Sequence, residues 1–391
     1  MASPASPPTL PTSATPARTS RRRSAPDTWP VHPAARWGLR ALLALPFVVV
    51  ALLSQDSPWV PEANRALAAR GDLVQWGDTS LTWTAEVFPP FGAALASLLG
   101  GNLLAMNLVA AAVIGLTLQR LAAVLVREGF GPWAVGAVLS VLVLTPPLYF
   151  LAANDLASLL GVALLVLALD GIASFVERQS TEAGFRAGLA LGVAVMVDPG
   201  AWLYALTLAA VAPFFVRRAG RSGRGAHVAT VAVLLFPAVA AVLFWLYVSW
   251  WFSADPLGGM QDAAAGGWFP GGVGESATAA ARAMSLTLLG APLVLIGFTI
   301  RAVREPWSLI APGIALAGLY LSLWFGLRAP VGQSYVVLTA LYVLLIAPRA
   351  PSRRRQVLIV VAAAVQLVIG WLVVLTSGGT LGDWVRTVVG A

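Results

Sequence analysis

Carboxylates and tryptophans gather in one polar stretch near the start of an otherwise apolar chain. Residues 55–101 hold acidic side chains interleaved with indole rings: Asp56, Glu62, Asp72, Asp78 and Glu86, with Trp59, Trp76 and Trp83. A carboxylate can take the proton from an attacking hydroxyl group, and an indole ring can stack on a sugar. Glu62 and Asp56 are therefore the candidate catalytic bases. Trp59 and Trp83 are candidate substrate-binding residues at the rim of the same site.

Two arginines are candidate cations for this chemistry. Arg65 follows Glu62 by one helical turn and lies on roughly the same helix face, and Arg328 lies at the end of a predicted span. A guanidinium group holds a phosphate leaving group through charge-assisted hydrogen bonds. One base and one cation suffice for transfer from a phosphate-linked donor.

Asp155 and Asp198 are further candidate substrate-binding residues. Asp155 opens an apolar run, and Asp198 lies in the turn Val197-Asp198-Pro199-Gly200 between two short spans. Together with Asp56 they offer hard oxygen ligands, which would favour magnesium or manganese if a divalent cation takes part. Each acid also has a structural interpretation: Glu62 offsets a helix dipole, Asp155 caps a helix and Asp198 fills a turn. Both interpretations stay open at the level of sequence.

Composition places the chain in a membrane. Hydrophobic residues make up 58% of the chain and charged residues 11%, and the mean hydropathy is +0.80. This composition predicts an all-α polytopic membrane protein. The chain has no cysteine and only two distant histidines, His32 and His227, which argues against disulfides and against zinc or haem sites.

Hydropathy predicts eleven membrane-spanning helices and few soluble segments. The expected spans are 36–54, 103–126, 133–152, 155–175, 184–197, 200–216, 228–250, 285–300, 307–326, 331–347 and 357–376. Residues 1–35 read as a disordered tail and 36–376 as the transmembrane domain. Within that domain, 55–101 is a first loop with short interfacial helices and 251–284 is a second loop. Residues 377–391 form a C-terminal tail.

The arginines predict the orientation. All 25 basic residues are arginine, and under this topology twenty lie on the side of the N-terminus while five lie on the other: Arg65, Arg70, Arg282, Arg328 and Arg386. The positive-inside rule then places the N-terminus in the cytoplasm and the first loop and C-terminus outside the cytoplasmic membrane. Because the arginines lie between apolar runs, their abundance does not indicate nucleic-acid binding.

Four features follow one another along the chain in an informative order. They are a first span, a loop that reads PEANRALAARGDLV and then EVFPPFGAALASLLGG, a proline-containing third span that leads to Asn154-Asp155, and the short hairpin around Asp198. This order resembles the GT-C superfamily, in particular its aminoarabinose-transferase and protein O-mannosyltransferase-like branch. The resemblance covers most of residues 36–216 and continues more weakly in GQSYVVLTALYVLLIAP. It implies a glycosyltransferase that takes a sugar from a polyprenyl-phosphate carrier, with membrane lipids around it.

This chain departs from the family pattern at three positions. Pro61-Glu62 stands where the family usually has an Asp-Glu pair, Phe88 where relatives often have a lysine, and Asn107 where an arginine often opens the second span. A catalytically inactive scaffold of the same fold, which binds a lipid or an unidentified partner protein, therefore stays open as the alternative function. A transporter is disfavoured, because no ionisable residue falls in the middle third of any expected span.

Overall fold

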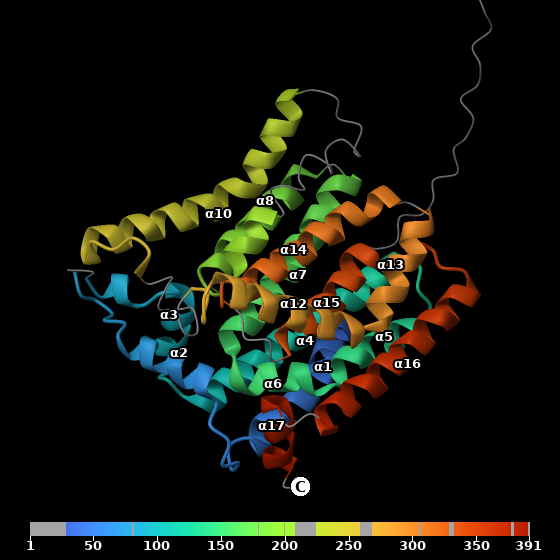
Figure 1. The fold of residues 1–391 in the computed structure, drawn as a ribbon, viewed down its shortest axis with the longest axis horizontal. Helices are drawn as coiled ribbons and strands as arrows, with labels where there is room; N and C mark the ends of the chain where they lie inside the picture. The colour runs from blue at the N-terminus through green and yellow to red at the C-terminus, as the bar shows by residue number, and fades with distance from the viewer. Residues whose placement is uncertain are drawn as a thin grey trace, which may run out of the picture.

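The computed structural model describes residues 29–389 apart from 80–81, 179, 199, 208–223, 259–267, 305, 328–331 and 377–378. Within these residues the chain is entirely helical and has no strand, which confirms the all-α class (Figure 1).

Long apolar helices form the body of the protein. Their bounds are α1 (Pro33–Leu53), α4 (Leu103–Arg127), α5 (Pro132–Val143), α6 (Pro146–Asn154), α7 (Leu156–Arg178), α8 (Thr181–Val195), α10 (Arg224–Ser253), α12 (Val273–Leu289), α13 (Pro292–Arg304), α14 (Ile310–Trp324), α15 (Gln333–Leu341) and α16 (Arg353–Thr376). Shorter elements are α2 (Glu62–Asp72), η1 (Thr82–Glu86), α3 (Pro90–Leu98), η2 (Pro306–Leu309), η3 (Tyr342–Ile346, a π-helical segment) and α17 (Thr380–Val389).

Six helices in the described part of the chain are long and apolar enough to cross a membrane, and there are up to eight spans if each of two bent pairs counts as one. The protein is therefore a multi-pass membrane protein. The expected eleven spans are not reached. Two of the missing ones are short helices, α8 and the Gln333–Ile346 segment, and a third, at 200–216, extends beyond the described residues.

The two bent pairs correct two expected boundaries. The single span expected at 133–152 is α5 and α6, which meet at an angle of 52° because Pro146 and Pro147 end one helix and start the next. The expected loop at 251–284 contains most of α12, which meets α13 at 84° where Gly290 and Pro292 break the helix. At the N-terminal side, α1 begins at Pro33, inside the expected tail, whose first 28 residues lie outside the described part.

The first loop is helical, as expected. Its helices α2 and α3 pack against each other, and a Cβ atom at Gly71 of α2 would lie 2.8 Å from the backbone nitrogen of Ser97. After α3 the chain reverses through Gly100 and Gly101, whose φ angles of +61° and +65° favour glycine. Asn102 then caps α4 by accepting a hydrogen bond from the Ala105 N–H. These contacts hold α2 near the start of α4.

Glycines along α8 face both of its neighbours: Gly184 lies against Phe175 of α7, and Gly188 and Gly192 lie against α10. Gly184, Gly188 and Gly192 recur every four residues along α8, and α8 contacts both α7 and α10. A Cβ atom at Gly188 would lie 2.6 Å from the Val233 carbonyl oxygen of α10. Small residues at this spacing let helix backbones approach closely in a membrane.

Replacing Gly188 by alanine is expected to lower the free energy of unfolding by about 1–3 kcal/mol, because the new methyl group meets backbone that cannot rotate away. Thermal unfolding in mild detergent measures the effect. Gly136→Ala is the matched control: it adds a methyl group to α5 where nothing lies within 4 Å, so it should raise stability by up to about 1 kcal/mol. Equal midpoints for the two variants would contradict the packing described here.

An acidic side chain is buried between two arginines where α4 and α7 pack together. Asp170 is 1% exposed and accepts hydrogen bonds from Arg120 Nε at 2.8 Å and from Arg127 Nη2 at 2.9 Å. Since a lone buried carboxylate would be costly, the two arginines compensate the charge of Asp170, and the three side chains act as one ion-paired unit. The unit lies about 22 Å along α7 from Asp155, so it belongs to the opposite end of the bundle.

Candidate functional site

Carboxylates line a cavity of about 400 Å³ between the first loop, α6, α15 and α17. We call it the carboxylate cavity, and its lining residues are Trp59, Val60, Glu62, Ala63, Phe150, Leu151, Asn154, Asp155, Gln333 and Thr380. Its size is typical of sites for small molecules. Its walls combine two acids, two amides, a hydroxyl group and two aromatic rings.

A second cavity, of about 390 Å³, lies beside the first. We call it the arginine cavity, and its lining residues are Ser54, Gln55, Ser57, Trp59, Pro61, Arg65, Asn102, Leu103, Leu104, Asn107, Ala153, Asn154 and Trp384. No carboxylate is among them. In the part of the chain that the structure describes, Arg65 forms no ion pair with a carboxylate. An unpaired guanidinium group in a polar cavity is suited to an anionic ligand.

Trp59 and Asn154 belong to both cavities and form the partition between them. The Trp59 indole donates a hydrogen bond to Asn154 Oδ1 at 2.7 Å, and Asn154 in turn donates to the Phe150 carbonyl at 2.9 Å. Aromatic packing extends the partition, because Phe150 contacts Trp59 edge-on at 6.3 Å and Trp384 at 5.6 Å between ring centroids. A ligand that occupies both cavities must pass over this partition.

Asn64 fixes α2 to the helices behind the partition. This side chain is 1% exposed, donates to Asn107 Oδ1 at 3.1 Å and accepts from the Leu156 N–H at 2.8 Å. The second bond satisfies a backbone N–H at the start of α7 that has no partner within its own helix. Because Asn64 lies between Glu62 and Arg65, it sets the positions of both.

Several predicted site residues do meet. Glu62, Asp155 and Trp59 line the carboxylate cavity, and Arg65 lines the arginine cavity. The structural interpretation of Asp155 also holds, since its Oδ1 accepts from the Ser158 N–H at 2.9 Å in the manner of a helix cap. One oxygen of this carboxylate is thus used by the fold while the side chain borders the cavity.

Other predicted site residues lie elsewhere. Asp56 is exposed and lines neither cavity, although its neighbours Gln55 and Ser57 do. Asp198 is 2% exposed and packs against Gly161 of α7, where its Oδ1 accepts from the Gly200 N–H at 2.9 Å. Burial and this bond within the turn agree with the structural interpretation of Asp198 as a turn residue.

Trp83 packs in an aromatic cluster with Phe88 and Trp245 of α10, and it lines neither cavity. Arg328 lies outside the described residues. Of the four candidate acids Asp56, Glu62, Asp155 and Asp198, two line the carboxylate cavity, namely Glu62 and Asp155.

The proposed metal ligands are not brought together. Asp155 borders a cavity, whereas Asp56 is on the exposed loop and Asp198 is buried against α7. Among the described residues, no group of three or more histidine, aspartate or glutamate side chains is placed to hold a metal ion. Participation of a divalent cation therefore stays a prediction, and the positions of these side chains add no support to it.

Sequence reasoning missed the amides and the C-terminal helix. Gln333, Asn64 and Asn154 sit in apolar surroundings, and polar side chains at such positions are a signal in membrane proteins. The helix α17 contributes Thr380 to one cavity and Trp384 to the other, and it packs on α6 next to the marked C-terminus (Figure 1). Its alternation of apolar and polar residues at helical spacing is the signal that could have found it.

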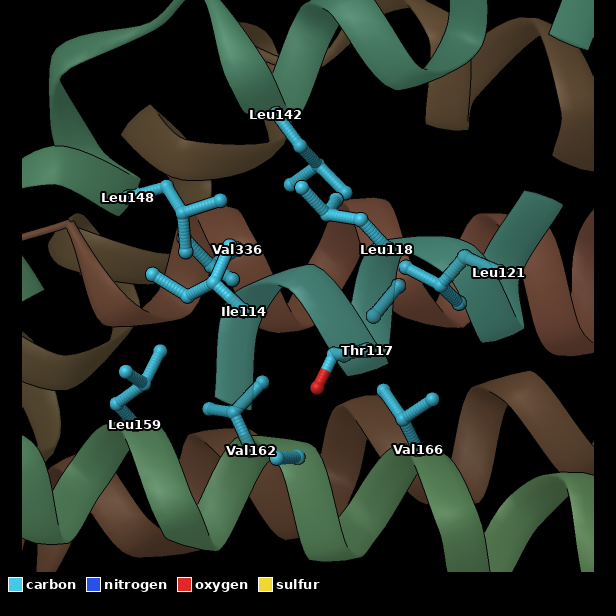
Figure 2. A pocket seen from close by; sticks show the side chains of 12 residues that line it. Ile114, Thr117, Leu118, Leu121, Leu142, Leu148, Leu159, Val162, Val166 and Val336 are labelled. Atoms are coloured by element: carbon cyan, nitrogen blue, oxygen red, sulfur yellow. The ribbon is translucent and has the colours of Figure 1, made fainter. Parts of the chain in front are cut away.

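A third cavity is unrelated to this chemistry. It lies inside the bundle among aliphatic side chains of α4, α5, α6, α7 and α15, and Figure 2 shows them pointing toward one another. Its volume of about 20 Å³ would admit one water molecule, yet the Thr117 hydroxyl there already donates to the Val113 carbonyl at 2.8 Å. This space is a packing gap of the core.

Comparison with known proteins found no family model, no curated protein and no solved structure that matches this chain.

Proposed function

We propose that this protein is a membrane glycosyltransferase that moves a sugar from a polyprenyl-phosphate carrier to an acceptor hydroxyl group. One observation carries the proposal: α2 presents Glu62 to one cavity and Arg65 to the adjacent one, with Trp59 and Asn154 at their junction. A base and a phosphate-binding cation are the two groups that this transfer requires.

In this proposal the donor phosphate lies in the arginine cavity and the acceptor lies in the carboxylate cavity. The acceptor oxygen attacks the anomeric carbon of the sugar, and its proton passes to the Glu62 carboxylate. The bond between that carbon and the phosphate oxygen breaks, and polyprenyl phosphate leaves with the electron pair. Arg65 stabilises the charge that develops on the leaving phosphate. No step is assigned to a metal ion.

Residues near the junction have supporting roles. The Trp59 ring offers an apolar face to the sugar, and Asn154 keeps that ring in place through its hydrogen bond of 2.7 Å. Asn64 holds α2 against α4 and the start of α7, so that Glu62 and Arg65 keep their places at the two cavities. Such positioning contributes to rate because reacting groups must stay aligned.

Polyprenyl phosphate is expected to copurify with the wild-type protein, and Arg65→Gln is expected to retain at least roughly tenfold less of it, because the charge-assisted contact to phosphate is lost. Mass spectrometry of extracted lipid measures the ratio of lipid to protein. Arg70→Gln is the matched control, since Arg70 lies on the same helix and lines neither cavity. It should retain wild-type lipid.

Two outcomes would count against the proposal. Equal lipid retention in both variants would remove Arg65 from the phosphate site. Retained polyprenyl phosphate without any transfer from added sugar-carrying lipid would instead favour the inactive scaffold.

A further inference from the structure

Gln333 is buried at the wall of the carboxylate cavity with an unused hydrogen-bond donor. The residue is 3% exposed and opens α15, and its Nε2 has no partner in the part of the chain that the structure describes. A carboxamide carries two N–H donors as well as an acceptor oxygen. Burying such donors without a partner destabilises the fold, so a group of this kind needs an explanation.

The charges around Gln333 limit what its partner can be. Glu62 and Asp155 line the same cavity, and the repulsion of two carboxylates opposes an anionic ligand. A bare cation would suit the two carboxylates but offers no acceptor atom to the unpaired N–H donors of Gln333. A neutral ligand that both donates and accepts hydrogen bonds satisfies all three side chains.

Hydroxyl groups have this dual character. A hydroxyl donates to a carboxylate such as Glu62 and accepts from an amide such as Gln333. The aromatic rings of Trp59 and Phe150 line the same cavity and offer apolar faces to C–H groups. A wall that combines hydrogen-bonding side chains with aromatic faces suits a saccharide, because a saccharide carries several hydroxyl groups on a ring with C–H faces.

We propose that the carboxylate cavity binds the acceptor as a neutral saccharide, and that Gln333 donates a hydrogen bond to one of its hydroxyl oxygens. The inference rests on the proposed function for the role of the saccharide as acceptor, because Glu62 borders this same cavity. The acceptor is then a glycan, and neither a protein side chain nor a phosphate-bearing lipid.

Saturation-transfer NMR on the purified protein in lipid nanodiscs tests binding directly. The probes are methyl glycosides of neutral hexoses and pentoses with their di- and trisaccharides, alongside glucuronic acid and glucosamine as charged comparisons. We expect signals from at least one neutral saccharide and weaker ones from glucuronic acid, whose carboxylate is repelled by Glu62 and Asp155. Gln333→Met, which keeps the length of the side chain and removes its donors, should weaken binding roughly 3- to 10-fold.

Thermal unfolding without saccharide separates this role from a structural one. Since Gln333→Met removes an unpaired buried donor, the midpoint should stay the same or rise. Gln75→Met is the matched control, because Gln75 is exposed on the first loop and lines neither cavity, and it should change neither binding nor midpoint. A clear fall of the midpoint in Gln333→Met would show a structural hydrogen bond and overturn the assignment.

The results for binding and for transfer can differ, and each difference is informative. If no neutral saccharide up to a trisaccharide binds, the glycan inference is wrong, even when the protein transfers sugar from the lipid donor to another acceptor. Saccharide binding that depends on Gln333 supports the inference, and it does so even if no transfer from polyprenyl-phosphate sugar occurs and the proposed function fails.

Discussion

Replacing Glu62 by glutamine is expected to lower the rate of sugar transfer by about 10²-fold or more. The amide keeps the size of the side chain and its place at the start of α2, yet it cannot take a proton from the acceptor. Because Glu62 is exposed to the cavity and forms no ion pair among the described residues, its loss leaves no buried charge unpaired. Stability and lipid retention should therefore stay near wild type.

Release of polyprenyl phosphate from a sugar-carrying lipid in nanodiscs measures this rate. Glu86→Gln is the matched control, since Glu86 is an exposed carboxylate of the same loop and lines neither cavity. It should transfer at the wild-type rate. Full activity of Glu62→Gln would move the base to Asp155 or Asp56, and full activity of all three glutamine or asparagine variants would leave this loop without a catalytic role.

Asp170→Ala should lower the free energy of unfolding by about 3 kcal/mol. The substitution removes the carboxylate that bonds both Arg120 and Arg127. It leaves the Arg127 side chain, 13% exposed, without that partner. An uncompensated charge in these surroundings costs far more than the pair contributes. Thermal unfolding in detergent, followed by tryptophan fluorescence, measures the loss.

A triple variant distinguishes lost pairing from lost volume. Exchanging Asp170 for leucine and both Arg120 and Arg127 for methionine removes all three charges while filling the space, so most of the stability should return. Asp255→Ala, at an exposed loop position, controls for the loss of an acid as such. A triple variant less stable than Asp170→Ala would show that the bundle depends on the charges themselves.

Helices with long apolar runs could be predicted well, and helix breaks could not. The expected spans at 103–126 and 357–376 match α4 and α16, because hydropathy over some 20 residues is a strong signal. The break between α5 and α6 depends on Pro146-Pro147, and proline in a membrane helix is compatible with either a kink or an end. Hydropathy places most of α12 in a loop, because Glu275 and Arg282 lower the mean hydropathy of this helix.

The same limit applies to the candidate site. Glu62 and Arg65 lie close together along one helix, so their proximity could be predicted from spacing alone. Whether a distant acid joins them depends on tertiary packing: Asp155 does border the cavity, whereas Asp198 faces α7. The sequence around Gln333 has no motif that marks a ligand, and its importance follows only from burial without a partner.

The walls of the carboxylate cavity are made at very different times during synthesis. More than 300 residues separate Trp59 from Thr380, which both line it. At ribosomal speeds of about 5–20 residues per second, the first loop waits roughly 15–60 s for α17, and α6 waits roughly 10–45 s. Until then Glu62 and Asp155 face a cavity with one side missing. The cavity is thus completed late, after the helices that support its other walls have been made.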